Sequence, residues 1–367
     1  RAEALAERWG PCEVVRLPEQ AFAPGFVNAH SHAFQIALRG RGECYGGAGD
    51  NFWTWRAEMY RLVERIDRAE MLRHCLQAFK EMLQAGITCV GEFHYLHHSA
   101  EAAAGEPGSS EGCTYELDDV LVEAAQVAGI RLVMLCTHYE LTGFGGQPVE
   151  GPQRRFFSPS TDSLAAHVAR MEAKYDLLRG GGDPRVTFGF AAHSLRATGL
   201  PELIALSGEC QLRGAKLHVH LEEQTEEVES CKRHHQGATP MRLLLDALPG
   251  SLSHVTAVHC THTLPEELAE FVGRGGRVCV CPATEGALGD GIPPLGEPAV
   301  QLAAAQRSAG ADPGDSYVCL GTDCNASIDF QGEMRWLEYG QRLRFQRRGV
   351  LTDLAPPPAP APAPEEG

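Results

Sequence analysis

Short apolar runs alternate with longer amphipathic stretches along most of the chain. Eight of the runs predict strands, because they are nearly continuous in apolar residues and end at polar or turn residues. They lie within residues 21–32, 87–98, 131–140, 185–194, 216–223, 255–262, 277–285 and 317–325. The stretches between them have the wider apolar spacing of helices. The predicted order is therefore strand and helix in regular alternation.

The predicted helices connect consecutive strands, and several end in glycine just before the next strand, as helices followed by short loops do. They cover residues 52–86, 116–129, 163–180, 200–214, 240–250, 264–276, 298–310 and 332–346. Eight such units predict an α/β fold, a closed parallel (β/α)₈ TIM barrel. An open, doubly wound sheet is the alternative, which the count of eight strands disfavours.

Polar residues gather at one end of the predicted strands. Histidine or aspartate stands at or just after the carboxyl end of most of them, at His30, His32, His94, His138, His193, His220, His259 and Asp323. In a barrel these ends share the face that carries active sites. A single histidine there would be an ordinary hydrogen-bonded residue, but so many of them predict a functional site.

The segment PGFVNAHSHAFQ sends His30 and His32 to one face of a strand, about 6 to 7 Å apart along the backbone. Together with His220 in HVHLEE and Asp323 in GTDCN, they form three imidazoles and one carboxylate, a set that suits Zn²⁺. One zinc ion per chain is expected, because the fourth strand, RVTFGFAAHS, offers no lysine or acid to bridge a second. His218 lies deeper on the face of His220 and is interpreted as a packing or supporting residue.

Composition narrows the classes of function. The chain has 367 residues and a formal net charge of −16, which repels phosphate backbones, so no nucleic-acid partner is expected. No apolar run approaches the roughly 20 residues that span a bilayer, so no membrane contact is expected. The 13 cysteines show no paired framework, and several stand in apolar runs. Reduced thiols and a cytoplasmic location are therefore expected.

Several segments resemble a known group of enzymes. The motifs PGFVNAHSHAF, HVHLEEQ, AVHCTH and GTDCN are similar to the metal-site motifs of the amidohydrolase superfamily. More narrowly, NFWTWRAEMY, EFHYLHH, GFGGQP, AAHSLRA, CPATEGALGDG and MRWLEYGQRL resemble the formimidoylglutamate deiminases, over about residues 20 to 350. The resemblance implies zinc-dependent hydrolysis of N-formimino-L-glutamate to N-formyl-L-glutamate and ammonia, a step of histidine degradation.

The resemblance also implies catalytic roles. Asp323 would accept a proton from the attacking water, and Glu223 would pass protons to the imine and then to the departing ammonia. His259 would orient the nucleophile and stabilise charge on the intermediate, although the motif HCTH leaves open whether His259 or His262 does so. The remaining acids of this segment are expected to be solvated, namely Glu222, Glu226, Glu227 and Glu229.

A substrate with two carboxylates needs a fixed cation and neutral hydrogen-bond donors. His193 and Arg196, in HSLR after the fourth strand, provide both, and arginine can bind a carboxylate with two parallel hydrogen bonds. The family pattern assigns further substrate contacts to Gln35 and Tyr95. In an alternative interpretation, Arg196 pairs with a carboxylate on a helix. The expected partner is a small dicarboxylate amidine.

Two groups of residues have competing interpretations. One group consists of His94, His97 and His98. In the preferred interpretation these histidines position the loop around Tyr95, and in the alternative they bind a second metal. The other group is an aromatic stripe at roughly helical spacing, which predicts core packing. In the superfamily the same region can also cover the active-site mouth or form a homodimer contact, and both are alternatives here; the group consists of Trp53, Trp55 and Tyr60.

Two features depart from the family pattern. The family's small β-sandwich is expected to be largely missing, with residues 1–23 as its remnant, 24–350 as the barrel and 351–367 as a disordered Pro/Ala-rich tail. Asn325 stands where the family commonly has histidine, which would alter substrate preference or rate. Two alternatives follow: a truncated metal-binding homologue with little or no activity, and a related amidohydrolase that deaminates another amidine, a guanidino acid or a heterocycle.

Overall fold

Eight parallel strands form the centre of the structure, a computed structural model that describes residues 21–44, 47, 49–104, 113–178, 185–308 and 316–351. The strands pair in chain order and are β1 (Phe26–Ser31), β2 (Ile87–His94), β3 (Arg131–His138), β4 (Val186–Ser194), β5 (Leu217–Leu221), β6 (Val255–His259), β7 (Arg277–Val280) and β8 (Val318–Leu320). All but the first residue of the predicted tail, residues 351–367, and most of the predicted sandwich remnant, residues 1–23, lie outside the described residues.

The first and last strands meet, which closes the barrel. Asp323, just after β8, forms a parallel bridge with Ser31, and its backbone N–H donates to the His30 carbonyl at 3.0 Å. The Asn28 amide adds a buried hydrogen bond of 2.6 Å to the Thr322 hydroxyl across the same seam. The predicted (β/α)₈ barrel is therefore confirmed, and the open doubly wound sheet is wrong.

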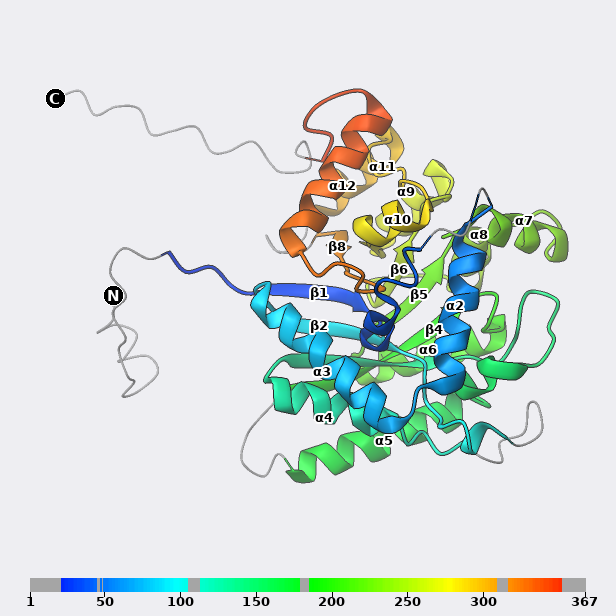
Figure 1. The fold of residues 1–367 in the computed structure, drawn as a ribbon. Coiled ribbons are helices and arrows are strands. Elements are labelled where there is room, and N and C mark those ends of the chain that lie inside the picture. The colour runs from blue at the N-terminus through cyan, green and yellow to red at the C-terminus, as the bar shows by residue number, and fades with distance from the viewer. Residues whose placement is uncertain are drawn as a thin grey trace, which may run out of the picture.

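Helices surround the strands (Figure 1). They are α2 (Phe52–Arg65), α3 (Arg68–Gln84), α4 (Asp118–Ala128), α5 (Thr161–Leu178), α6 (Leu200–Arg213), α7 (Thr225–His234), α8 (Pro240–Ala247), α9 (Pro265–Gly273), α10 (Pro282–Leu288), α11 (Pro298–Ser308) and α12 (Phe330–Phe345). Short 3₁₀ turns occur at η1 (Ala33–Leu38), η2 (Ala102–Ala104) and η3 (Gly151–Phe156). Helix α10 and its place directly after β7 were not predicted from the sequence.

The predicted helix over residues 52–86 is two helices. The first ends at Arg65, and Asp67 begins the second by accepting the N–H of Glu70 at 2.8 Å, while Glu70 reaches back to the N–H of Asp67. This capping box satisfies the free N–H groups of a new helix start. The break lets α2 stand beside the carboxyl ends of the strands while α3 lies along the outside of the barrel (Figure 1).

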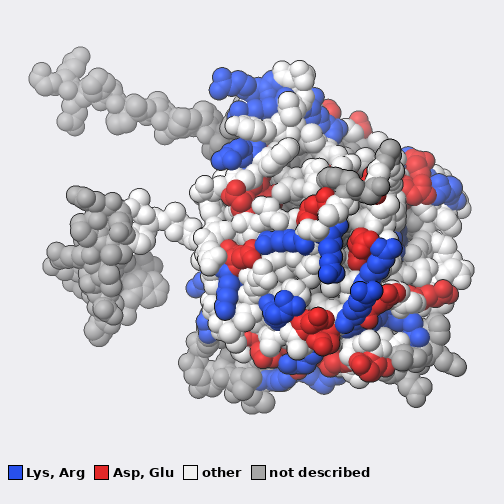
Figure 2. Space-filling model, in the orientation of Figure 1, with Lys and Arg blue, Asp and Glu red and all other residues white. Residues whose placement is uncertain are grey.

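The surface carries charges of both signs. Figure 2 shows acidic and basic side chains interspersed over most of one face, with basic side chains gathered at the top, where α12 lies. Despite the net charge of −16, this face is therefore not uniformly acidic. None of the helices in the described part of the chain is long and apolar enough to cross a membrane.

Candidate active site

Four side chains from distant parts of the chain meet at the carboxyl ends of the strands. His30 lies in β1, His32 directly follows it, His220 lies in β5 and Asp323 lies in the turn after β8. The Nε2 atoms of His30 and His32 each lie 3.3 Å from Asp323 Oδ1. The Nε2 atom of His220 lies 3.2 Å from that of His30 and 3.3 Å from that of His32. All four side chains are buried.

The hydrogen bonds of these rings determine which nitrogens carry protons. The Nδ1 atoms of His32 and His220 lie 2.8 Å from the carbonyl oxygens of Phe93 and His193, so each Nδ1–H donates there and each Nε2 keeps a lone pair. Burial lowers the pKa of His32 to about 3 and lowers that of His220 well below its usual value. Lone pairs that face one another at this distance repel unless a cation lies between them.

The donor set fits a divalent transition metal. Three neutral imidazole nitrogens and one carboxylate oxygen are ligands that Zn²⁺ accepts, and carbonyl partners on the opposite ring nitrogens are the usual support of such ligands. Although burial disfavours the charged form, the contact with His30 and the neighbouring imidazoles lowers the pKa of Asp323, so the carboxylate stays ionised. We conclude that the cluster is built to bind a metal ion.

His259, at the end of β6, lies between carboxylates. Its Nε2 atom is 3.7 Å from Glu223 Oε1 and 4.0 Å from Asp323 Oδ2, and its Nδ1 atom is 3.3 Å from Glu285 Oε1 on α10. Although burial disfavours the charged form, these carboxylates raise the pKa of His259 to about 10. Burial raises the pKa of Glu223 to about 7. The pair can therefore share and move a proton beside the metal cluster.

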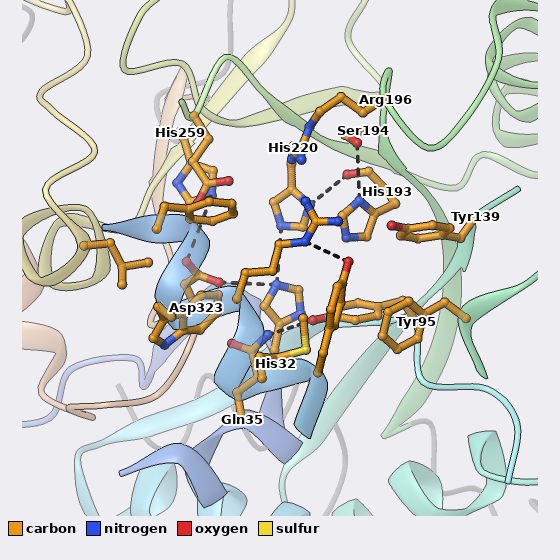
Figure 3. Close-up of a pocket in the computed structure, with 18 of the residues that line it drawn as sticks. His32, Gln35, Tyr95, Tyr139, His193, Ser194, Arg196, His220, His259 and Asp323 are labelled. Carbon is orange, nitrogen blue, oxygen red and sulfur yellow. Dashed lines mark hydrogen bonds and ion pairs between the residues drawn. The ribbon is translucent and has the colours of Figure 1, made fainter. Parts of the chain in front are cut away.

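A pocket opens next to the cluster. Figure 3 shows His32, His220, His259 and Asp323 beside it, facing a wall of polar and aromatic side chains. The wall includes Gln35, Trp55, Arg56, Tyr60, Tyr95, Tyr139, Phe156, His193 and Arg196. All the residues predicted for catalysis and for substrate contact thus converge on one cavity, whereas His262 lies outside its lining. Their individual roles remain predictions.

Gln35 and Tyr95 act as a pair. The Gln35 amide donates to the Tyr95 hydroxyl oxygen at 2.7 Å, which leaves the phenolic proton free to donate into the pocket. Burial raises the pKa of Tyr95 well above its usual value, so the phenol stays protonated. The pair therefore presents a neutral hydrogen-bond donor to a ligand.

Two guanidinium groups line the pocket, one more than the sequence analysis identified. Arg196 follows β4, and its Nε lies 3.8 Å from Glu227 Oε1 on α7 without a hydrogen bond to any described residue. Arg196 thus lines the pocket and also pairs with a carboxylate on a helix. Arg56, on α2, donates to the Tyr60 hydroxyl at 2.7 Å. Arg56 was missed because a charged residue in an amphipathic helix is usually solvated.

The prediction that the neighbouring glutamates are solvated is wrong for two of them. Glu227 is buried and accepts the N–H of Glu223 at 3.2 Å, and Glu222 is buried and accepts the N–H of Met241 at 2.9 Å. Glu227 lies on α7, a helix that the sequence analysis did not delimit, and Glu222 directly follows β5. Glu226 and Glu229 are exposed as predicted.

The aromatic stripe of α2 belongs partly to the pocket. Trp55 and Tyr60 line it, and Trp53 is 37% exposed, with the guanidinium of Arg56 5.3 Å from its ring centre. Core packing alone is therefore an incomplete account, and a dimer contact remains a prediction. His138 stays out of the pocket, with its Nε2 3.9 Å from Glu202 Oε2, and the buried His218 also lies outside the lining.

A metal cluster beside a ligand pocket at the carboxyl ends of a (β/α)₈ barrel defines a metal-dependent hydrolase. The profile of the amidohydrolase family matches residues 22–351, and the chain belongs to this family. The formimidoylglutamate deiminase of Pseudomonas aeruginosa is 37% identical over 331 residues, which are 90% of this chain and 67% of that protein.

Two further proteins match nearly the whole of this chain. The 8-oxoguanine deaminase of Pseudomonas aeruginosa is 27% identical over 337 residues, 90% of this chain and 66% of that protein. The crystal structure of an amidohydrolase from Brucella melitensis is 30% identical, with a TM-score of 0.77 over 95% of this chain and 72% of that one. The chain spans about two thirds of the length of these curated relatives.

Proposed function

We propose that this chain is a zinc-dependent deiminase that hydrolyses N-formimino-L-glutamate to N-formyl-L-glutamate and ammonia. The observation that carries the proposal is the pocket, which combines a buried metal cluster with two guanidinium groups, Arg56 and Arg196. A dicarboxylate with a compact amidine head needs both features. The 37% identity to a formimidoylglutamate deiminase supports the same substrate.

Substrate binding follows from the donors of the pocket. Arg56 and Arg196 bind one carboxylate of the substrate, because a guanidinium matches a carboxylate with parallel, charge-assisted hydrogen bonds. The Tyr95 hydroxyl, the Gln35 amide and the His193 imidazole bind the other as neutral donors. With both carboxylates held, the formimino carbon is directed toward the metal cluster.

One zinc ion per chain is held by His30, His32, His220 and Asp323 in this proposal. When bound, zinc lowers the pKa of water toward neutrality and polarises the C=N bond. The Oδ2 atom of Asp323, on the side of His259, accepts a proton from the attacking water. His259 donates a hydrogen bond to the developing negative charge, since its neighbours keep it protonated at neutral pH.

Glu223 moves the protons that the reaction requires. Water adds one oxygen to the formimino carbon, the C–N bond to the terminal nitrogen breaks, and that nitrogen leaves as ammonia. Glu223 protonates the imine nitrogen and then carries a second proton, released by water, to the departing ammonia. A pKa of about 7 suits this role, because both forms of the carboxyl group are populated near neutrality.

Deamination of a heterocycle is the second candidate, favoured by the 27% identity to an 8-oxoguanine deaminase. Two arginines in the pocket favour the dicarboxylate, because a neutral ring would offer neither of these part-buried guanidinium groups a carboxylate to bind. A weakly active metal-binding homologue is the third candidate. We place the reaction in the cytoplasm, since all the cysteines of the described residues are free thiols.

The test is ammonia release from N-formimino-L-glutamate by the purified chain loaded with zinc. Glu223→Gln should lower kcat about 10²- to 10⁴-fold without loss of metal, since it removes the proton carrier and no ligand. Glu226→Gln is the matched control, because this exposed glutamate of the same segment pairs with Arg233 on the surface. Equal activity of the Glu223 variant and the control would overturn the proposed role.

A further inference from the structure

Asp118 forms a second buried cluster, outside the pocket lining. It is the first residue of α4, and its carboxylate is fully buried. His94 Nε2 and His97 Nδ1 lie 3.0 and 2.9 Å from its Oδ1, and His167 Nε2 lies 2.9 Å from its Oδ2. Three imidazoles from β2, the following loop and α5 thus converge on one carboxylate. The proposed reaction uses none of these residues.

The hydrogen bonds of His97 determine its charge. Its Nε2 lies 2.8 Å from the Thr137 carbonyl oxygen, which only accepts, so Nε2 carries a proton. Its Nδ1 faces the carboxylate of Asp118, which is also only an acceptor, so Nδ1 carries a proton as well. Although His97 is buried, the charge of Asp118 raises the pKa of His97, which agrees with a proton on each of the two ring nitrogens. The ring is a buried imidazolium.

A bound metal ion is the other way to satisfy these atoms. Only three ligand atoms of the described residues lie together, from His94, His97 and Asp118. His167 contacts the other carboxylate oxygen and so does not complete a four-ligand shell, which structural zinc sites have. The protonated pair therefore explains the geometry better than an ion does.

The cluster holds the loop that carries Tyr95 on both sides of that residue. His94 precedes Tyr95, and His97 follows it by two positions. The N–H groups of His97 and His98 donate to the Arg155 carbonyl at 3.0 and 3.1 Å. The Arg155 guanidinium is also buried and donates to the His98 carbonyl at 2.8 Å.

Arg155 also connects this loop to α2, which carries Arg56. Its guanidinium donates to the carbonyl oxygens of Val63 and Ile66 at the end of that helix. These carbonyls have no partner within the helix, so Arg155 caps its carboxyl end. The Tyr95 loop and the Arg56 helix are therefore fixed against the same buried network.

We propose that Asp118 is a positioning residue, whose ion pair with the His97 imidazolium fixes the loop of residues 94–98 so that the Tyr95 hydroxyl meets a carboxylate of the substrate. The choice of substrate rests on the proposed function, but the protonation of His97 does not. Asp118 touches neither the metal cluster nor the pocket, so it acts only through the loop.

A double-mutant cycle with Tyr95→Phe tests this role. Tyr95→Phe and Asp118→Asn should each raise KM about 10-fold or more with a smaller change in kcat, since each loses a hydrogen bond to a carboxylate. The double variant should be no worse than the poorer single variant, because both changes remove the same contact. Asp119→Asn is the control, since Asp119 is the next residue of α4 and pairs with the exposed Lys174 on α5. Additive losses would overturn the proposal.

Ring ¹⁵N NMR of the histidine-labelled holoenzyme gives a readout that needs no substrate. The His97 signal, assigned with His97→Gln, should show two protonated ring nitrogens at pH 7 and should lose this signature in Asp118→Asn. A neutral His97 at pH 7, or a second equivalent of zinc that Asp118→Asn loses, would overturn the proposal. If the wild type releases no ammonia from N-formimino-L-glutamate while His97 stays an imidazolium, the proposed substrate is wrong but the ion pair between Asp118 and His97 is supported.

Discussion

The Nε2 atoms of His30 and His220 lie 3.2 Å apart although the two histidines are 190 residues apart in the chain. Neither ring is protonated at neutral pH, because burial lowers the pKa of both. The Nδ1–H of His220 donates to the His193 carbonyl, so its Nε2 keeps a lone pair, and the Nε2 of His32, in the same state, lies 3.3 Å away. Two lone pairs at this separation are stable only with a shared cation. The arrangement therefore specifies a metal site rather than a hydrogen-bonded pair.

Replacing His30 with glutamine should release the metal. His30→Gln removes one of three imidazole ligands, so metal affinity should fall by more than about 100-fold, since even the hydrogen-bond partners of ligands are worth about 10- to 100-fold. Metal analysis after dialysis measures the change. His262→Gln is the control, because His262 lies outside the cluster. Full zinc content in His30→Gln would contradict the assigned ligand set.

The two pocket arginines should control affinity for a dicarboxylate. Arg196→Ala and Arg56→Ala should each raise KM for N-formimino-L-glutamate by about 10- to 150-fold, the range for losing a hydrogen bond to a charged group. Arg196→Lys should restore only part of the affinity, because an ammonium group cannot form the paired contact. Steady-state kinetics measures both effects.

The control for the arginines is Arg213→Ala, since Arg213 forms surface pairs with Glu172 and Glu209 on the outside of the barrel. Its KM should equal that of the wild type. A substrate with one carboxylate should respond to fewer of the pocket substitutions. An unchanged KM in both Arg196→Ala and Arg56→Ala would favour a neutral heterocycle as the substrate.

Asn325 should affect stability more than substrate preference. Its Nδ2 donates to Ser31 Oγ at 3.0 Å and to the His32 carbonyl at 3.1 Å, and its φ of 56° is one that asparagine tolerates better than most residues. Asn325→Leu should lower the free energy of unfolding by about 3 kcal/mol or more, because buried polar groups of the seam lose their partners. Urea denaturation measures this loss, and a stable variant with altered KM would contradict it.

Glu333 should make stability depend on pH. It is buried and accepts the N–H of Ala283 at 2.9 Å, and burial raises its pKa from 4.5 to about 8. Its neutral form stabilises the fold at low pH, and this contribution is lost as the pH rises through about 8. Between pH 4.5 and about 8, the free energy of unfolding of the wild type should therefore fall relative to that of Glu333→Gln, by up to about 1.4 kcal/mol per pH unit.

Urea denaturation at several pH values compares the two proteins. Glu64→Gln is the control, since Glu64 is exposed on α2 and should give a constant difference from the wild type. A difference between Glu333→Gln and the wild type that does not change with pH would show that Glu333 is ionised at no cost in the folded state.

The barrel and the cluster of strand-end histidines could be predicted because both depend on local patterns. Eight apolar runs, seven of which end in His or Asp, predict strands, and parallel strands must bring those ends to one face. The break at Asp67 also had a local signal, the capping-box pattern of Asp67 and Glu70, which the long amphipathic run concealed.

The missed residues depend on packing that no local pattern specifies. Arg56 has the spacing of a solvated helix residue, and it reaches the pocket only because α2 stands beside the barrel mouth. Glu227 looks like one of several surface acids until α7 turns it toward Arg196. Asp118 meets histidines that precede it by 21 and 24 residues and follow it by 49, contacts that only the assembled barrel creates.

Ammonia release measured on one metal-analysed sample, with N-formimino-L-glutamate compared with 8-oxoguanine and other amidines, tests the central claim most directly. With one equivalent of zinc, the chain should release one ammonia for each N-formyl-L-glutamate formed, and turnover should fall about 10²- to 10⁴-fold with Glu223→Gln. A zinc-loaded chain that deaminates a neutral heterocycle but leaves N-formimino-L-glutamate intact would contradict the account.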